Sequence, residues 1–101
     1  MNVPCAAGSG RKQILDAFEG RLRPAMAKFK PEFVLISAGF DSRVGDPLGQ
    51  LTLSDADFAD LTHIMLEIAG GRLVSVLEGG YSLSGLGAAS AAHVEALRAS
   101  A

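Results

Sequence analysis

The chain has 101 residues, of which 49% are apolar and 20% are charged, and its formal net charge is −2. This length accommodates one domain or part of one, and the composition is that of a globular protein, not a disordered one. The small negative charge gives no electrostatic case for nucleic acid or an anionic membrane as a partner, and no apolar run reaches the roughly 20 residues that cross a bilayer.

Residues 1–10 are predicted to be extended and then turn-like, because Pro4, Gly8 and Gly10 interrupt any regular element. They lack the basic start and the apolar stretch of a secretory signal. The single cysteine, Cys5, cannot form an internal disulfide and is interpreted as a small apolar filler. These features predict a cytoplasmic location.

Residues 11–29 are predicted to form a helix, because apolar side chains recur along them every three or four residues. These side chains are Ile14, Phe18, Leu22, Met26 and Phe29. Pro24 lies inside the pattern and lacks the N–H that an interior helical residue donates, so we expect a kink or a break near residues 20–23. Pro31 should stop the helix.

Two mostly apolar runs, Phe33–Ser37 and Leu73–Leu77, are predicted to be strands. Because the runs are nearly continuous, both strands are expected to be covered on both faces of the sheet. A helix that starts at a capping box headed by Ser54 should connect them. After the second strand, a helix rich in small residues should begin at Ser82 or Ser84.

The order strand, helix, strand predicts a right-handed β-α-β unit with parallel strands, and therefore an α/β fold. Parallel strands end at the same edge of their sheet. Asp41 follows the first strand after Gly39, and Tyr81 follows the second after Gly79 and Gly80. Because ligands of open α/β sheets bind outside this edge, the sequence predicts a site with one carboxylate and one phenol.

Two strands and three helices are too few for a closed α/β domain, because both edges of a two-stranded sheet stay open. One interpretation is that the chain is part of a larger protein. The alternative is a non-catalytic binding or assembly module, whose open strand edges recruit a partner chain.

Other polar residues are interpreted as structural. Asp46 lies in a Gly-Asp-Pro turn, Arg43 is expected on the solvated rim of the site, with contact to a substrate or partner as the alternative, and Glu78 either positions its loop or is solvated. His63 is assigned to a helix surface or a partly buried position, and His93 either to packing or to a group that supports the site residues. The two histidines are thirty residues apart on separate predicted helices, so no metal role is assigned to them.

Two segments resemble the superfamily of zinc-dependent deacetylases, which includes histone deacetylases, acetylpolyamine amidohydrolases and acetoin-utilisation deacetylases. Residues 37–49 read Ser-Ala-Gly-Phe-Asp-Ser-Arg-Val-Gly-Asp-Pro-Leu-Gly, and residues 77–81 read Leu-Glu-Gly-Gly-Tyr. The resemblance extends over essentially the whole chain and is nearest to a bacterial, class II-like form. It implies a partial arginase-like three-layer α/β/α fold, with residues 1–101 as the C-terminal portion of a single deacetylase domain.

The resemblance also implies a reaction, the hydrolysis of an N-acetyl amide by a water that Zn²⁺ activates. Asp41 would be a zinc ligand, and Tyr81 would hydrogen-bond the substrate carbonyl and stabilise the oxyanion. Leu48 would line the acyl tunnel, while Gly79 and Gly80 would form its floor and the hinge of Tyr81. The substrate would be an acetylated protein lysine, an acetylated polyamine or a small N-acyl metabolite; no oligomeric state is predicted.

The chain departs from this family in one respect that limits its chemistry. Members also use an Asp-x-His pair to bind the metal and a His-His pair to activate the water. Here His63 and His93 are the two histidines, and neither motif is present. The chain is therefore expected to lack the N-terminal strands and helices of the domain, and to be inactive on its own.

Overall fold

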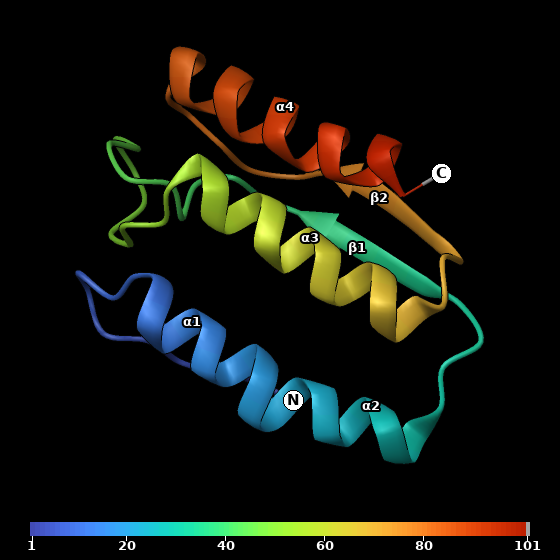
Figure 1. Cartoon of the computed structure of the whole chain (residues 1–101). Coiled ribbons are helices and arrows are strands. Elements are labelled where there is room, and N and C mark those ends of the chain that lie inside the picture. The colour runs from blue at the N-terminus through green and yellow to red at the C-terminus, as the bar shows by residue number, and fades with distance from the viewer. Residues whose placement is uncertain (101) are drawn as a thin grey trace.

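A computed structural model describes residues 1–100 (Figure 1). The elements, in chain order, are α1 (Arg11–Ala17), η1 (Phe18–Leu22), α2 (Arg23–Phe29), β1 (Val34–Ala38), α3 (Asp55–Ala69), β2 (Leu73–Leu77) and α4 (Leu83–Ala99). None of the helices in this range is long and apolar enough to span a membrane. The predicted order of helix, strand, helix, strand and helix is confirmed.

The first helical segment is irregular where Pro24 was expected to disturb it. Between α1 and α2 the chain forms one π-helical stretch, η1, in which the N–H of Arg23 donates to the carbonyl of Phe18. Pro24 then lies in the first turn of α2, where a missing N–H is tolerated. The chain therefore stays helical past Pro24, and α1, η1 and α2 follow one another without a break (Figure 1).

The two strands are parallel, as predicted, with Val34 paired to Leu73 and Ala38 paired to Leu77. The second strand has the predicted bounds, and the first is shifted by one residue. Backbone pairing continues past both strands, because Glu78 N–H donates to Ala38 O at 2.9 Å and Phe40 N–H donates to Gly79 O at 2.8 Å. The loops that follow β1 and β2 therefore start side by side.

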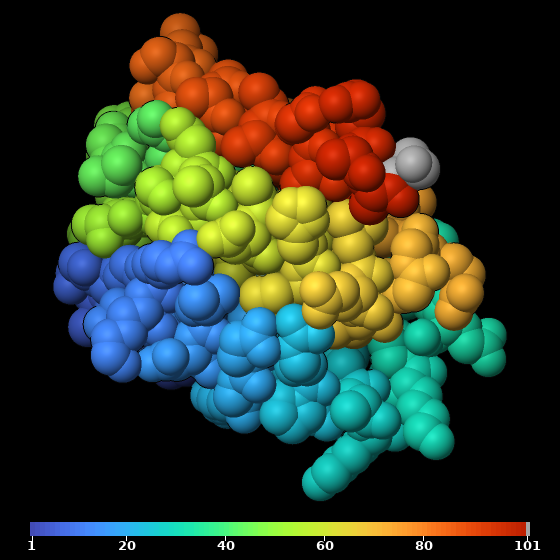
Figure 2. All heavy atoms as spheres, viewed as in Figure 1, coloured from blue at the N-terminus to red at the C-terminus, as the bar shows by residue number. Residues whose placement is uncertain are grey.

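Helices cover one face of this sheet, with α3 and α4 lying along β1 and β2 (Figure 1). Beneath them is a small core of Ala38, Phe40, Leu53, Phe58 and Ala89. Seen from the helical side, α1, α2, α3 and α4 form a continuous packed layer (Figure 2).

The prediction that both faces of the strands are covered is wrong for this chain. Leu35, Val74 and Val76 point away from the helices and are 70%, 46% and 55% exposed. Phe29, the last residue of the apolar pattern that predicted the first helix, is also exposed. The apolar runs are those of a doubly covered sheet, but residues 1–100 supply only one helical layer.

The helix starts follow the predicted local chemistry. Ser54 Oγ accepts from the N–H of Asp57, and the Asp57 carboxylate accepts from the N–H of Ser54 at 2.8 Å, which completes the capping box of α3. Of the two candidates for α4, Ser82 is the cap, because its hydroxyl accepts from the N–H of Gly85.

Candidate functional site

The carboxylate of Asp41 lies against the glycine turn that follows β2. A Cβ atom built at Gly79 would stand 2.8 Å from Asp41 Oδ2, and one at Gly39 would stand 3.1 Å from Oδ1. Glycine at these two positions therefore leaves room for the carboxylate. The structure thus brings Asp41 and the turn that carries Tyr81 together at the carboxyl edge of the sheet.

Tyr81 stands at the rim of this edge and is 52% exposed. Its backbone N–H donates to Asp46 Oδ2 at 2.8 Å. The preceding Gly80 has a φ of 132°, and a Cβ there would stand 2.8 Å from Leu86 and 3.3 Å from Phe40. Glycine is therefore needed at this position for both its conformation and its space.

Leu48 lies on the long connection between β1 and α3, and its side chain is 70% exposed. The connection is held to itself by Val44 N–H donating to Leu53 O at 2.8 Å and by Leu53 N–H donating to Ser42 O at 3.0 Å. A Cβ at Gly49 would overlap the carbonyl oxygen of Asp41, so the two backbone segments cross in close contact. The Leu48 side chain consequently projects from an ordered loop beside Asp41.

Asp46 joins the two loops of the site, a role that the sequence did not indicate. Its Oδ1 accepts from the N–H groups of Leu48 at 2.9 Å and Gly49 at 2.8 Å, while Oδ2 accepts from Tyr81. Burial acts to raise the pKa of the Asp46 carboxyl, but these backbone donors outweigh it and the pKa lies below its ordinary value. The predicted turn is present; the bond to Tyr81 is additional.

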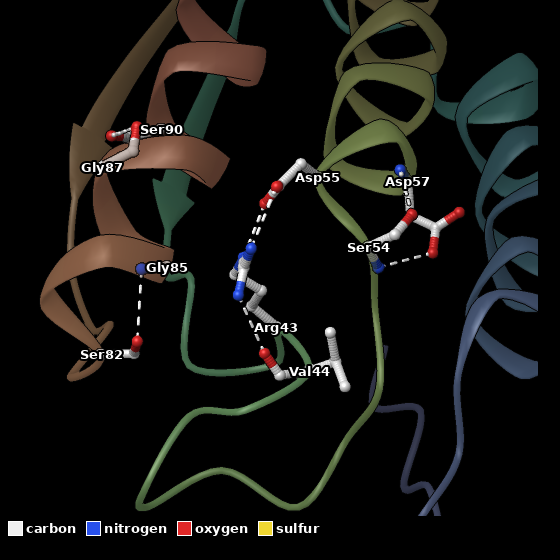
Figure 3. A network of polar contacts seen from close by, with 9 residues as sticks. All are labelled: Arg43, Val44, Ser54, Asp55, Asp57, Ser82, Gly85, Gly87 and Ser90. Atoms are coloured by element: carbon white, nitrogen blue, oxygen red, sulfur yellow. Dashed lines mark hydrogen bonds and ion pairs between the residues drawn. The ribbon is translucent and has the colours of Figure 1, made fainter.

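Arg43 is not a solvated rim residue, which corrects the prediction. Its Nε and Nη2 donate to the two carboxylate oxygens of Asp55 at 2.6 and 3.1 Å, and Nη1 donates to Val44 O (Figure 3). The Asp55 carboxylate raises the pKa of the Arg43 guanidinium. Because a Cβ at Gly85 would stand 3.0 Å from Nη1, the guanidinium also packs closely against the first turn of α4.

The two histidines lie on helices, as expected, and only one is buried. His63 is on the exposed side of α3. His93, on α4, is 7% exposed and bonds Thr62 Oγ1 through Nδ1 at 2.7 Å and Ser75 Oγ through Nε2 at 2.8 Å. Burial lowers its pKa. The prediction that His93 serves packing is confirmed by these contacts, which join α4 to α3 and β2.

The predicted site at the carboxyl edge of the sheet contains one candidate zinc ligand, Asp41. Within residues 1–100 no group of three or more His, Cys, Asp or Glu side chains is arranged to hold a metal. A catalytic zinc commonly takes three protein ligands and keeps one position open. The Asp41 carboxylate has the right chemistry and space for one of these ligands, so the described residues fit part of a zinc site.

Comparisons of the sequence and of the structure with known proteins both find deacetylases. The model of the histone deacetylase domain family matches residues 1–97. Polyamine deacetylase HDAC10 of Mus musculus is 47% identical over 87 residues, which are 85% of this chain and 13% of that protein. Histone deacetylase 15 of Arabidopsis thaliana is 38% identical over 98 residues, 96% of this chain and 18% of that protein.

Solved structures share the fold of the chain. The HDA15 HD domain matches with a TM-score of 0.93 and 37% identity, over 97% of this chain and 29% of that one. The histone deacetylase Clr3 matches with a TM-score of 0.91 and 34% identity, over 96% of this chain and 16% of that one. The chain spans less than a third of each of these relatives, and its α/β fold is part of theirs. It belongs to the histone deacetylase domain family.

Proposed function

We propose that the chain is the C-terminal portion of a single zinc-dependent deacetylase domain that hydrolyses an N-acetyl amide. The observation that carries this proposal is the contact between the Asp41 carboxylate and Gly79, in the turn that presents Tyr81. The family match over residues 1–97 and the deacetylase names of the relatives support it.

In this proposal Asp41 supplies one oxygen ligand to Zn²⁺, which when bound polarises the acetyl carbonyl and lowers the pKa of a water. Tyr81 donates its phenol O–H to the substrate carbonyl oxygen and stabilises the negative charge that develops there. Leu48 offers an apolar wall for the acyl chain. Gly79 and Gly80 form part of the floor of the proposed acyl tunnel, because they have no side chains that would fill it.

The substrate class follows from the same family and remains broad. An acetylated protein lysine, an acetylated polyamine and a small N-acyl metabolite all present the same acetamide to such a site. The exposed, apolar Leu48 side chain would suit the alkyl part of an acetylated lysine or polyamine. We place the protein in the cytoplasm and keep the bacterial, class II-like form as a prediction; the relatives named above are eukaryotic.

The chain by itself is proposed to be inactive and to bind zinc weakly. One carboxylate at the site edge leaves at least two ligand positions to residues outside this chain. Calorimetric titration of the 101-residue chain with Zn²⁺ should show weak or no binding. Tight one-to-one binding would contradict this part of the proposal.

The role of Tyr81 is tested in a complete enzyme that includes this segment. Tyr81→Phe removes the O–H alone and should lower turnover by a factor of order 10² while the zinc content stays the same. Ser84→Ala, which removes an exposed hydroxyl three residues further along, is the matched control and should leave turnover unchanged. Unchanged turnover in Tyr81→Phe would exclude the phenol from the mechanism.

The second candidate is a non-catalytic assembly module, and the open sheet face favours it. Leu35, Val74 and Val76 form an exposed apolar stripe that a partner chain could cover. Size-exclusion chromatography and thermal melting separate the two candidates. A stable monomer with a cooperative melt would support a self-sufficient module, whereas aggregation would support an incomplete domain.

A further inference from the structure

We propose that Asp46 is a positioning residue for Tyr81. The Asp46 carboxylate fixes the backbone of the turn that carries Tyr81 relative to the loop that carries Leu48. The inference rests on the proposed function for its catalytic consequence. The contacts on which it depends belong to the described structure and stand without that function.

The Asp46 carboxylate is shared between two segments that are far apart in the chain. One oxygen accepts two N–H bonds from Leu48 and Gly49, within its own loop. The other accepts the N–H of Tyr81, 35 residues away, at 2.8 Å. The Gly49 backbone in turn lies against the carbonyl of Asp41. A single buried carboxylate therefore links the backbone at all three proposed site side chains.

The bond to Tyr81 adds a restraint to the glycine turn, beyond the bond from Phe40 N–H to Gly79 O and the packing of Gly80 against Leu86 and Phe40. Gly80, just before Tyr81, has a φ of 132° and no side chain to hold it. Just after it, Ser82 is fixed as the cap of α4. No hydrogen bond within residues 1–100 holds the phenol itself, and the residue is 52% exposed. Among the hydrogen bonds of residues 1–100, the bond to Asp46 is the one that holds Tyr81 itself.

The consequence for catalysis is one of placement. An oxyanion donor is effective only when its O–H is held within about half an ångström of the productive position. Hydrogen bonds to an ionised acceptor are stronger than those to a neutral one, so a carboxylate is a suitable anchor for the Tyr81 backbone. Loss of this anchor should lower the rate through the tyrosine and leave the metal in place.

Asp46→Asn is the variant that tests this. Asparagine keeps one acceptor oxygen, which should stay with the two donors Leu48 and Gly49. Its NH₂ group would then face the N–H of Tyr81, where two donors repel. Asp60→Asn is the matched control, because Asp60 pairs with Arg11 on the surface and takes no part in the bonds of the Asp46 loop.

The chain offers a direct probe of the effect, because Tyr81 is its one tyrosine and it has no tryptophan. Tyrosine fluorescence therefore reports on Tyr81 alone. In Asp46→Asn the anisotropy should fall and quenching by acrylamide should increase, while Asp60→Asn should match the unmodified chain. Equal values in all three proteins would overturn the proposal.

A second measurement needs no substitution. By NMR, the Tyr81 amide proton should exchange with solvent at least about tenfold more slowly than an unstructured amide, although it lies outside helix and strand. Exchange at the unstructured rate would show that the bond to Asp46 does not persist, and would also overturn the proposal.

In a complete enzyme a double-mutant cycle connects Asp46 to the chemistry. Asp46→Asn should lower kcat about tenfold with a smaller change in KM, and it should have no further effect when Tyr81 is already phenylalanine. Multiplicative effects would show that Asp46 does not act through the phenol. If Tyr81→Phe alone leaves turnover unchanged, the proposed function fails, while fluorescence and exchange still decide whether Asp46 positions Tyr81.

Discussion

The packing of α4 onto the sheet depends on His93, and His93→Ala should be among the most destabilising single substitutions in this chain. Thr62 donates its own hydroxyl proton to Phe58 O at 2.6 Å, so it can only accept from His93 Nδ1–H. His93 Nε2 is then unprotonated and accepts from the hydroxyl of Ser75. The neutral ring thereby joins α3, α4 and β2.

The magnitude follows from what the alanine removes. One buried and one partly buried hydrogen bond contribute about 1 kcal/mol each. The ring also packs edge-on against Phe40, with centroids 5.7 Å apart, and its loss leaves a void that adds about 1–2 kcal/mol. The free energy of unfolding should therefore fall by about 3–4 kcal/mol, and the Tm of a domain of this size by at least about 12 °C.

Urea denaturation followed by circular dichroism measures this loss, in the chain or in a longer form that unfolds cooperatively. His63→Ala is the control, because it is the same substitution on the exposed side of α3 and should change stability by less than about 0.5 kcal/mol. Ser75→Ala removes one bond but leaves the ring, and should cost about 1 kcal/mol. Equal effects of His93→Ala and His63→Ala would refute the reasoning.

Three further predictions concern pH and the two faces of the molecule. Burial lowers the pKa of His93 below its ordinary value of 6.5, so as the pH falls the unfolded chain takes up the proton before the folded one. The free energy of unfolding should therefore fall as the pH drops below about 6.5. Urea denaturation between pH 7 and pH 5 should show this dependence in the control His63→Ala and lose it in His93→Ala. Gly79→Ala would put a methyl group 2.8 Å from Asp41 Oδ2, and in a complete enzyme it should lower zinc content measured by metal analysis, whereas Gly87→Ala, on an open helix surface, should not. Val74→Glu should change the free energy of unfolding of this chain by less than about 0.5 kcal/mol, because Val74 lies on the open sheet face. In a complete domain the same change should cost several kcal/mol, because a second helical layer would bury the charge. Equal effects in the two denaturation experiments would argue against that layer.

The parts of the fold that the sequence predicted are those with local causes. The capping box at Ser54 involves residues three apart, and the π-helical stretch η1 lies just ahead of Pro24, within one turn. The parallel arrangement of β1 and β2 follows from the helix between them. Because the strands are parallel, the placement of Asp41 against the turn before Tyr81 could also be predicted.

The parts that could not be predicted depend on contacts between distant residues. The pairing of Arg43 with Asp55 joins a loop to the start of a helix, and the bond from Tyr81 to Asp46 spans 35 residues. Neither has a periodic pattern that a sequence shows. The uncovered sheet face has a different cause. The apolar residues of a strand match the number of helical layers in a complete fold, and a segment of that fold need not contain all of those layers.

Two carboxylates on the same loop illustrate how hydrogen bonding separates a structural role from a binding role. Asp46 accepts three backbone N–H bonds, which use the lone pairs that a cation would need. Among the hydrogen bonds of residues 1–100 none reaches the Asp41 carboxylate, which rests against two glycines that contribute no side chain. The lone pairs of Asp41 are therefore available for the ligand role proposed for it, whereas those of Asp46 are engaged with the backbone of its own loop and of Tyr81.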